Sequence, residues 1–172
     1  MRISIFALAL TAAGPAHAEI VDSDATGMEI KHTVRIAASP QKVWETLIQP
    51  ARWWNSAHTF SGKTSNLTLE AKAGGCWCEV LEGGGSVMHQ TVGFIAPLKT
   101  LVLRGALGPF FNMGVEGAMV WGLKANGADT DVTLNYRAGG YVKDGFGKWA
   151  DPVDKVLSEQ VAGLKKASEA TP

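Results

Sequence analysis

The sequence has little of what marks a specialised class of protein. It has only 2 cysteines among 172 residues, too few for a disulfide-dense scaffold, so we expect burial of apolar side chains to stabilise the fold. Its 16 basic and 16 acidic residues balance, which offers no charge field for nucleic acid or an anionic membrane. No apolar run reaches the roughly 20 residues of a permanent membrane span. The whole chain is 46% apolar, which is an ordinary globular composition.

Motifs for the common enzyme classes and cofactors are also lacking. We find no Ser-His-Asp arrangement, Walker motif or dinucleotide-binding fingerprint in the sequence. We therefore expect no cofactor and no nucleic-acid partner. A site that binds a small molecule is the function that the sequence leaves open.

The N-terminus has the pattern of a secretory signal peptide. Arg2 precedes an apolar run over residues 3–13, and the small-x-small triplet 16–18 follows it. This predicts cleavage before Glu19, so we exclude residues 1–18 from the fold. We expect secretion across the inner membrane, to the periplasm in a Gram-negative bacterium, with no stable membrane insertion after cleavage.

The first part of the mature chain predicts a leader, a strand and a helix. Residues 19–27 are expected to form a flexible leader, and residues 28–168 a single domain. Residues 29–36 alternate apolar and polar side chains, which is typical of a half-buried strand. Ser39 and Pro40 then provide an N-cap and a first helical residue.

The rest of the chain predicts an antiparallel meander followed by one long helix. Glycine-rich turns, including Asn126-Gly127, separate the strands. The final helix is expected to have Asp151 as its N-cap and Pro152 as its first residue, because apolar residues then recur at three- and four-residue spacing. The strands are expected at residues 67–71, 76–81, 87–95, 100–105, 117–125 and 131–139.

Three segments resemble one known group of proteins. SPQKVWETLIQPARWW, GGCWCEV and HQTVGFIAPLKTLVLRG are similar to the START-like (SRPBCC) superfamily, in its branch of heat-shock ATPase activator homologues and polyketide-cyclase-like proteins. The similarity covers about residues 28–166. It implies an α+β helix-grip fold: a curved antiparallel sheet of about seven strands around a long C-terminal helix, with two short helices after the first strand. It also implies an apolar cavity between sheet and helix. A secreted chain would not meet a chaperone ATPase, so we do not expect co-chaperone activity.

The two cysteines, Cys76 and Cys78, leave three alternatives open. Residues two apart in an extended strand are separated by about 6.6 Å between Cα atoms, near the upper end of the roughly 4.4–6.8 Å found in disulfides. Two strand thiols are favoured, and a strained or redox-active bridge would need a bulge. A metal site is not expected, because His32, His58 and His89 lack metal-motif spacing.

Glu79 and His89 form the candidate acid-base pair. Trp77 and Glu79 share the strand face opposite the cysteines, and the resemblance implies that this face points inward. Burial would then raise the pKa of Glu79, and His89 on the next strand could pair with it. The alternative places Glu79 in solvent and gives His89 a structural role.

Aromatic and other large side chains provide the candidate lining of the cavity. Core packing is the alternative for each of them. The segment around Phe110 is an apolar, glycine-broken loop that could border the mouth of the pocket. The candidate ligand-binding residues are Trp77, Glu79, Phe110, Phe111, Met113, Met119, Trp121, Tyr136 and Trp149.

Together these patterns predict a non-enzymatic protein that binds a hydrophobic or amphipathic small molecule. The main rival is an enzyme of the cyclase or hydratase type that uses Glu79 and His89. A third alternative is an interaction protein with a filled core, which would have no cavity.

Overall fold

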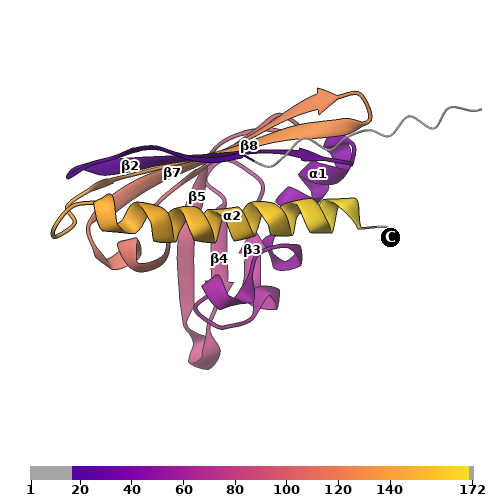
Figure 1. The fold of residues 1–172 in the computed structure, drawn as a ribbon. Helices are drawn as coiled ribbons and strands as arrows, with labels where there is room; N and C mark the ends of the chain where they lie inside the picture. The colour runs from indigo at the N-terminus through magenta and orange to yellow at the C-terminus, as the bar shows by residue number, and fades with distance from the viewer. Residues whose placement is uncertain (1–16, 171–172) are drawn as a thin grey trace, which may run out of the picture.

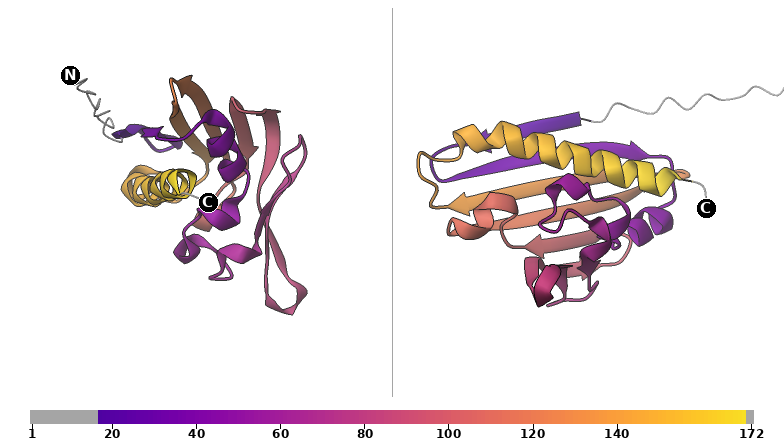
Figure 2. Two further views of the ribbon diagram at one scale, coloured as in Figure 1. Left: turned by 90° about the vertical axis from the view of Figure 1, so that its right-hand side faces the viewer. Right: turned by 90° about the horizontal axis from the view of Figure 1, so that it is seen from below.

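The computed structural model describes residues 17–170 and consists of one curved sheet and two α-helices (Figure 1). The sheet has 8 strands in the order β1-β2-β8-β7-β6-β5-β4-β3, and all neighbours pair antiparallel. The sheet bends around the C-terminal helix α2, Gly147–Glu169, which Figure 2 shows end-on. The strands are β1 His17–Ser23, β2 Gly27–Ile36, β3 Leu67–Leu69, β4 Cys76–Val80, β5 Ser86–Ala96, β6 Thr100–Arg104, β7 Val115–Asn126 and β8 Asp129–Gly140.

The first helix, α1 (Pro40–Leu47), begins where the sequence predicts. Ser39 accepts a hydrogen bond from the backbone N–H of Lys42, and Pro40 is the first helical residue. The second short helix that we expected is replaced by three 3₁₀ turns: η1 Pro50–Arg52, η2 Ser56–His58 and η3 Thr64–Asn66. These turns carry the chain from α1 to β3.

The prediction of a flexible leader at residues 19–27 is wrong. Most of this segment belongs to β1, which pairs with β2, so the sheet has 8 strands and not about seven. The turn between them is held by Asp24, whose carboxylate accepts hydrogen bonds from the N–H groups of Thr26 and Gly27. The predicted signal peptide lies outside the described residues, except that His17 and Ala18 begin β1.

The start of α2 also differs from the prediction. The helix begins at Gly147, before the predicted cap Asp151, and Pro152 lies inside it. The Trp149 N–H donates to the Phe146 carbonyl at 2.8 Å, and Phe146 and Ala150 are buried. Packing of this first turn against the core therefore extends the helix beyond the Asp-Pro signal.

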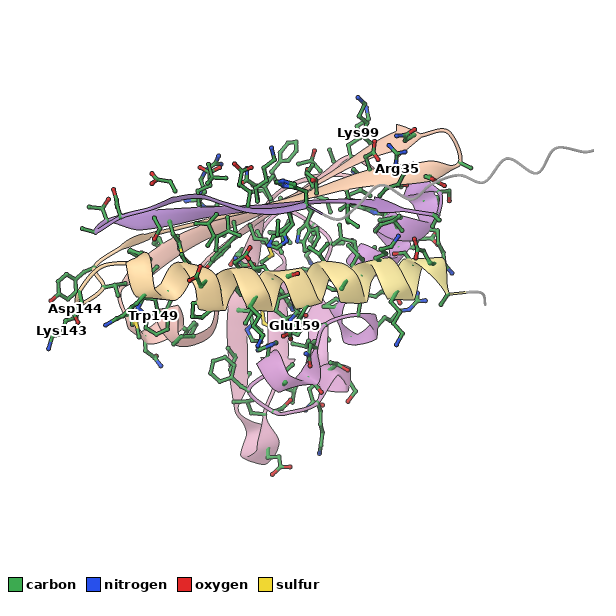
Figure 3. The ribbon with its side chains drawn as sticks, in the orientation of Figure 1. Arg35, Lys99, Lys143, Asp144, Trp149 and Glu159 are labelled. Atoms are coloured by element: carbon green, nitrogen blue, oxygen red, sulfur yellow. A yellow bond between two sulfur atoms is a disulfide. The ribbon has the colours of Figure 1, made fainter. Side chains whose placement is uncertain are left out.

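The core lies between the concave face of the sheet and α2. Within it, Trp53 packs edge-on against Trp121 with ring centroids 5.6 Å apart. Gly163 allows α2 to approach this cluster, because a Cβ there would lie 2.3 Å from the Trp53 carbonyl oxygen. In Figure 3, Arg35 and Lys99 lie on the far side of the sheet from α2. Neither helix within residues 17–170 has the length and apolar character needed to span a membrane.

Candidate functional site

A cavity of about 400 Å³ lies between the sheet and the first half of α2. Its walls come from β5, β8, the loop after α1, the segment before β7 and α2, so it forms only in the folded chain. Most of the lining is apolar, and the polar side chains at its surface are few, as in typical small-molecule sites. The lining residues are Trp54, His58, Thr59, Phe60, His89, Leu107, Gly108, Pro109, Phe110, Asn112, Tyr136, Trp149, Pro152, Val153 and Val156.

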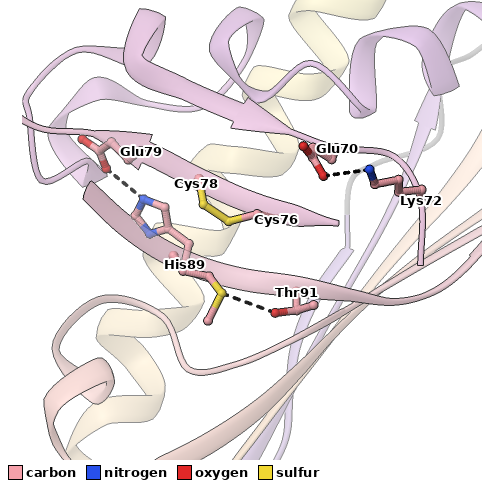
Figure 4. Close-up of a disulfide and its surroundings, with 8 residues drawn as sticks. Glu70, Lys72, Cys76, Cys78, Glu79, His89 and Thr91 are labelled. Atoms are coloured by element: carbon pink, nitrogen blue, oxygen red, sulfur yellow. Dashed lines mark hydrogen bonds and ion pairs between the residues drawn. A yellow bond between two sulfur atoms is a disulfide. The ribbon is translucent and has the colours of Figure 1, made fainter. Parts of the chain in front are cut away.

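Glu79 and His89 form a buried pair beside this cavity (Figure 4). His89 Nε2 lies 2.8 Å from Glu79 Oε2, so the predicted pairing across the β4–β5 hairpin is present. The Glu79 carboxylate also accepts hydrogen bonds from the backbone N–H of Phe60, at 3.1 Å, and of Ser61. His89 lines the cavity and Glu79 lies behind it, so a ligand would meet the imidazole.

The expected rise in the pKa of Glu79 is wrong. Burial does raise the pKa of Glu79, but hydrogen bonds from Ser61, Phe60 and His89 outweigh it and bring the pKa below its ordinary value of 4.5. Glu79 is therefore a carboxylate at neutral pH and can only accept hydrogen bonds. It follows that His89 donates through Nε2–H, which leaves Nδ1 for other partners.

A β-bulge in β5 turns two consecutive residues, His89 and Gln90, toward the inside. Trp77 on β4 pairs with Gln90 and Cys78 pairs with Met88, so His89 is the extra residue on β5. His89 and its neighbour Gln90 are consequently both buried, where a regular strand would bury only one of them. Gln90 uses its amide to donate to the Gly105 carbonyl at 2.8 Å.

Cys76 and Cys78 are joined by a disulfide in the structure. Their Cα atoms are 5.4 Å apart, and the register shift lies between Trp77 and Cys78, so the bulge that a bridge would need is present. Both cysteines are half-buried on the face of β4 opposite Trp77 and Glu79. Of the three alternatives, the structure therefore contains the bridge.

Tyr136 supplies a second polar group to the cavity. Its hydroxyl oxygen accepts a hydrogen bond from the Leu107 N–H at 3.4 Å. Burial raises the pKa of Tyr136 to about 12, so the hydroxyl stays protonated at neutral pH. Its hydrogen is thus available to an acceptor on a ligand.

His58 stands at the more open part of the wall. Its Nε2 lies 2.9 Å from Glu159 Oε2, which also accepts a hydrogen bond from the Asn55 amide. Hydrogen bonds from His58 and Asn55 lower the pKa of Glu159, so this carboxylate is ionised too. In Figure 3, Glu159 projects from the middle of α2.

Three of the nine predicted ligand-binding residues line the cavity: Phe110, Tyr136 and Trp149. The other six do not. Trp77, Met119 and Trp121 are packed into the core, and only about 10 Å³ of free space lies between Trp77 and Trp121. Phe111 is 49% exposed, and Met113 packs against the core from outside the wall. Glu79 is screened by His89.

Several lining residues were missed by sequence reasoning. Val153 and Val156 belong to the apolar residues that recur along the final helix, and this periodicity is a signal for a face turned toward the cavity. Trp54 belongs to a pair of adjacent tryptophans, for which core packing is the ordinary interpretation. His58 and Phe60 lie in a polar loop, and no local pattern shows that this loop folds against β4 and β5. Within residues 17–170 no three His, Cys, Asp or Glu side chains converge as a metal site would require.

Comparison with known proteins is informative at the level of fold. No family model matches the sequence, and no curated protein does. MLL2253 from Mesorhizobium loti matches with a TM-score of 0.56 and 18% identity, over 83% of this chain and 98% of that one. CalU16 from Micromonospora echinospora matches with a TM-score of 0.61 and 13% identity, over 94% and 79%. At these identities the likeness shows the fold alone, an antiparallel sheet around a long C-terminal helix. The chain has the helix-grip fold.

A third neighbour shares the fold over part of its length. DynU16, described as a putative protein in the dynemicin biosynthetic locus, matches with a TM-score of 0.59 and 20% identity. The match covers 83% of this chain and 47% of DynU16, so this chain spans about half of that protein. Structural similarity at such low identity shows the fold alone, and function has to be argued from the cavity.

Proposed function

We propose that this protein binds a hydrophobic or amphipathic small molecule in the cavity between the sheet and α2. The observation that carries the proposal is the cavity of about 400 Å³, with aromatic walls and a few polar groups. Trp54, Phe110 and Trp149 offer flat apolar surface, while His89 and Tyr136 can orient a polar group. An interaction protein with a filled core would have no such space.

The superfamily branch and the cellular location of the protein are also part of the proposal. The similarity of three sequence segments to the START-like superfamily supports a place in its branch of heat-shock ATPase activator homologues and polyketide-cyclase-like proteins. The pattern of residues 1–18 supports export, with the protein acting as a periplasmic carrier. Mass spectrometry of the protein recovered from the periplasm tests both cleavage before Glu19 and the presence of a copurified ligand.

The binding proposal makes a direct prediction for a cavity-filling variant. Val156→Trp places an indole in the cavity, so we expect binding of anilinonaphthalene sulfonate, an amphipathic aromatic probe, to weaken at least tenfold. Fluorescence titration measures the affinity. Ser158→Trp, at an exposed position of α2, is the matched control and should bind as the wild type does. Unchanged binding by Val156→Trp would contradict the proposal.

The His89–Glu79 pair favours a second candidate, an enzyme of the cyclase or hydratase type. An imidazole whose Nε2–H is held by a carboxylate at 2.8 Å is arranged as a general base, with Glu79 as the positioning residue. The copurified molecule would then be converted by the wild type and not by His89→Gln. A ligand that both proteins bind and leave unchanged would favour the carrier.

A further inference from the structure

The Cys76–Cys78 disulfide is placed where a small thiol can reach it. Both sulfurs lie on the convex face of the sheet, away from the cavity, and both residues are half-buried. Val80 and Met88, their neighbours on that face, are 57% and 55% exposed. Figure 4 shows the bridge on β4 beside the Glu79–His89 pair. A thiol from solvent therefore need not enter the core to attack it.

The bridge does little as a structural staple. Only one residue separates the two cysteines, so the loop it closes removes little conformational freedom from the unfolded chain. Its effect is local. The Cα atoms of Cys76 and Cys78 are 5.4 Å apart, whereas two residues of regular strand would span about 6.6 Å. The disulfide thus holds β4 in a contracted form around Trp77.

This contraction lies directly opposite the bulge in β5. The residues that pair with Cys76 and Cys78 are Thr91 and Met88, so β5 uses one more residue than β4 over the same length. The extra residue is His89, which lines the cavity, and the bulge puts its neighbour Gln90 on the same inward face. The bridge and the position of His89 are two parts of one local distortion.

We infer that Cys76–Cys78 is a thiol-exchange site whose reduction changes the His89 wall of the cavity. A small-molecule thiolate attacks one sulfur, which breaks the S–S bond and gives a mixed disulfide with one free cysteine. A second small-molecule thiolate attacks the small-molecule sulfur of this mixed disulfide and releases the bound cysteine, leaving two cysteine thiols and one small-molecule disulfide. Two electrons and two protons thus pass from the small thiols to the bridge.

The consequence of reduction follows from the register. Without the bridge β4 can extend to its ordinary rise, and the pairing that keeps both His89 and Gln90 inward is no longer enforced. The contact between His89 and Glu79 then changes. We expect the oxidised protein to bind the ligand more tightly than the reduced protein. This effect on affinity rests on the proposed function.

Glutathione redox buffers test the inference on the full mature protein. Maleimide tagging and mass spectrometry measure the reduced fraction, NMR follows the His89 and Gln90 amides, and anilinonaphthalene sulfonate reports on the cavity. We expect reduction without unfolding, shifted signals for both residues, and at least fivefold weaker dye binding. Cys76→Ser/Cys78→Ser should match the reduced protein and ignore glutathione. Val80→Ser, on the same face of β4, should respond as the wild type does.

The outcomes separate this inference from the binding proposal. A bridge that is reduced only when the protein unfolds would overturn the inference, as would complete reduction with unchanged His89 and Gln90 signals. Shifted signals in a protein that binds no dye in either state would support the exchange site and count against the proposed binding function. If the double variant does not fold, reduction of the wild type decides the matter.

Discussion

The charge of Glu79 depends on a loop that is remote in sequence. Its carboxylate is fully buried, yet it accepts two backbone N–H groups from Phe60 and Ser61 and one from the His89 ring. Three donors around one carboxylate favour its ionised form despite the loss of water. Glu79 is therefore an anchor for both the loop and the imidazole.

Glu79→Gln should lower the free energy of unfolding by about 2 kcal/mol at pH 7, because charge-assisted hydrogen bonds become neutral ones. The pKa of Glu79 is lowered in the folded protein, so its stabilisation is complete above the ordinary value of 4.5 and is lost as pH falls through the lower folded value. Urea unfolding between pH 3 and 7 measures this.

The difference between the two proteins should accordingly shrink as pH falls below 4.5. Glu82→Gln is the control, since the Glu82 side chain is 95% exposed, and it should change little. Equal stability of Glu79→Gln and wild type at pH 7 would show that the buried hydrogen bonds contribute nothing.

At the residue scale, the sequence predicts which side chains lie together better than it predicts the direction of their pKa shifts. The strand pattern and hairpin length place Glu79 and His89 together, because local periodicity determines which residues share a face. The pKa direction could not be predicted, since its cause is a loop 18 and 19 residues away along the chain. The bulge that turns Gln90 inward beside His89 also has no local signal.

At the scale of elements, α2 makes one very close backbone approach to the segment after α1. The backbone of Trp53, directly after η1, passes so near Gly163 that a Cβ would lie 2.3 Å from the Trp53 carbonyl oxygen. A helix-interior glycine ordinarily costs stability relative to alanine. Here the absence of a side chain at Gly163 lets α2 pack against the backbone of Trp53.

Gly163→Ala should therefore destabilise the protein by about 1–2 kcal/mol, since overpacking by about 1–3 kcal/mol exceeds the gain of about 1 kcal/mol in helix propensity. Thermal or urea unfolding measures the change. Gly147→Ala, where a Cβ would meet nothing within 4 Å, should be neutral or slightly stabilising. A stabilised Gly163→Ala variant would refute the close packing.

Most elements could be predicted from the sequence, and the exceptions have a common cause. Residues 29–36 and the later strands carry clear alternation, and Ser39-Pro40 marks the start of α1. β1 was missed because its exposed edge position leaves it without a buried face. The first turn of α2 was missed because packing of Phe146 and Ala150, and not a cap, determines where the helix starts.

At the scale of the whole molecule, a buried histidine lies between the sheet and α2. His32 on β2 is 4% exposed, and its Nε2 lies 3.0 Å from an Asp154 oxygen in a geometry that makes no hydrogen bond. Burial lowers the pKa of His32, and the nearby Asp154 opposes this only in part. The neutral ring is thus the form that fits between the two layers.

The folded protein should lose stability as pH falls below about 6.5. A lowered folded pKa means that the unfolded chain takes up a proton more readily, so the contribution of His32 is complete above 6.5 and declines toward its folded pKa. The slope for one such group is at most about 1.4 kcal/mol per pH unit. Denaturation of wild type and His32→Gln between pH 5 and 8 measures it, and parallel curves would rule out this role for His32.

The architecture could be predicted as a whole, whereas the cavity could be predicted only in outline. The order of elements and three sequence motifs imply a helix-grip fold, and the sheet and long helix agree with it. Which residues line the cavity depends on where α2 crosses the sheet, and that is determined by many distant contacts. Phe110, Tyr136 and Trp149 were therefore found, while Trp121 proved to be core.

The pairing of β1 with β2 bears on when the predicted signal peptide would be removed. The predicted cleavage site, between Ala18 and Glu19, lies inside β1, where these two residues pair with His32 and Lys31. A peptidase must hold that bond extended in its own cleft, which a strand already paired in a sheet does not permit. If the chain is cleaved there, as we propose, processing would have to precede pairing of β1 with β2, and a precursor that folded early would protect its own signal from removal.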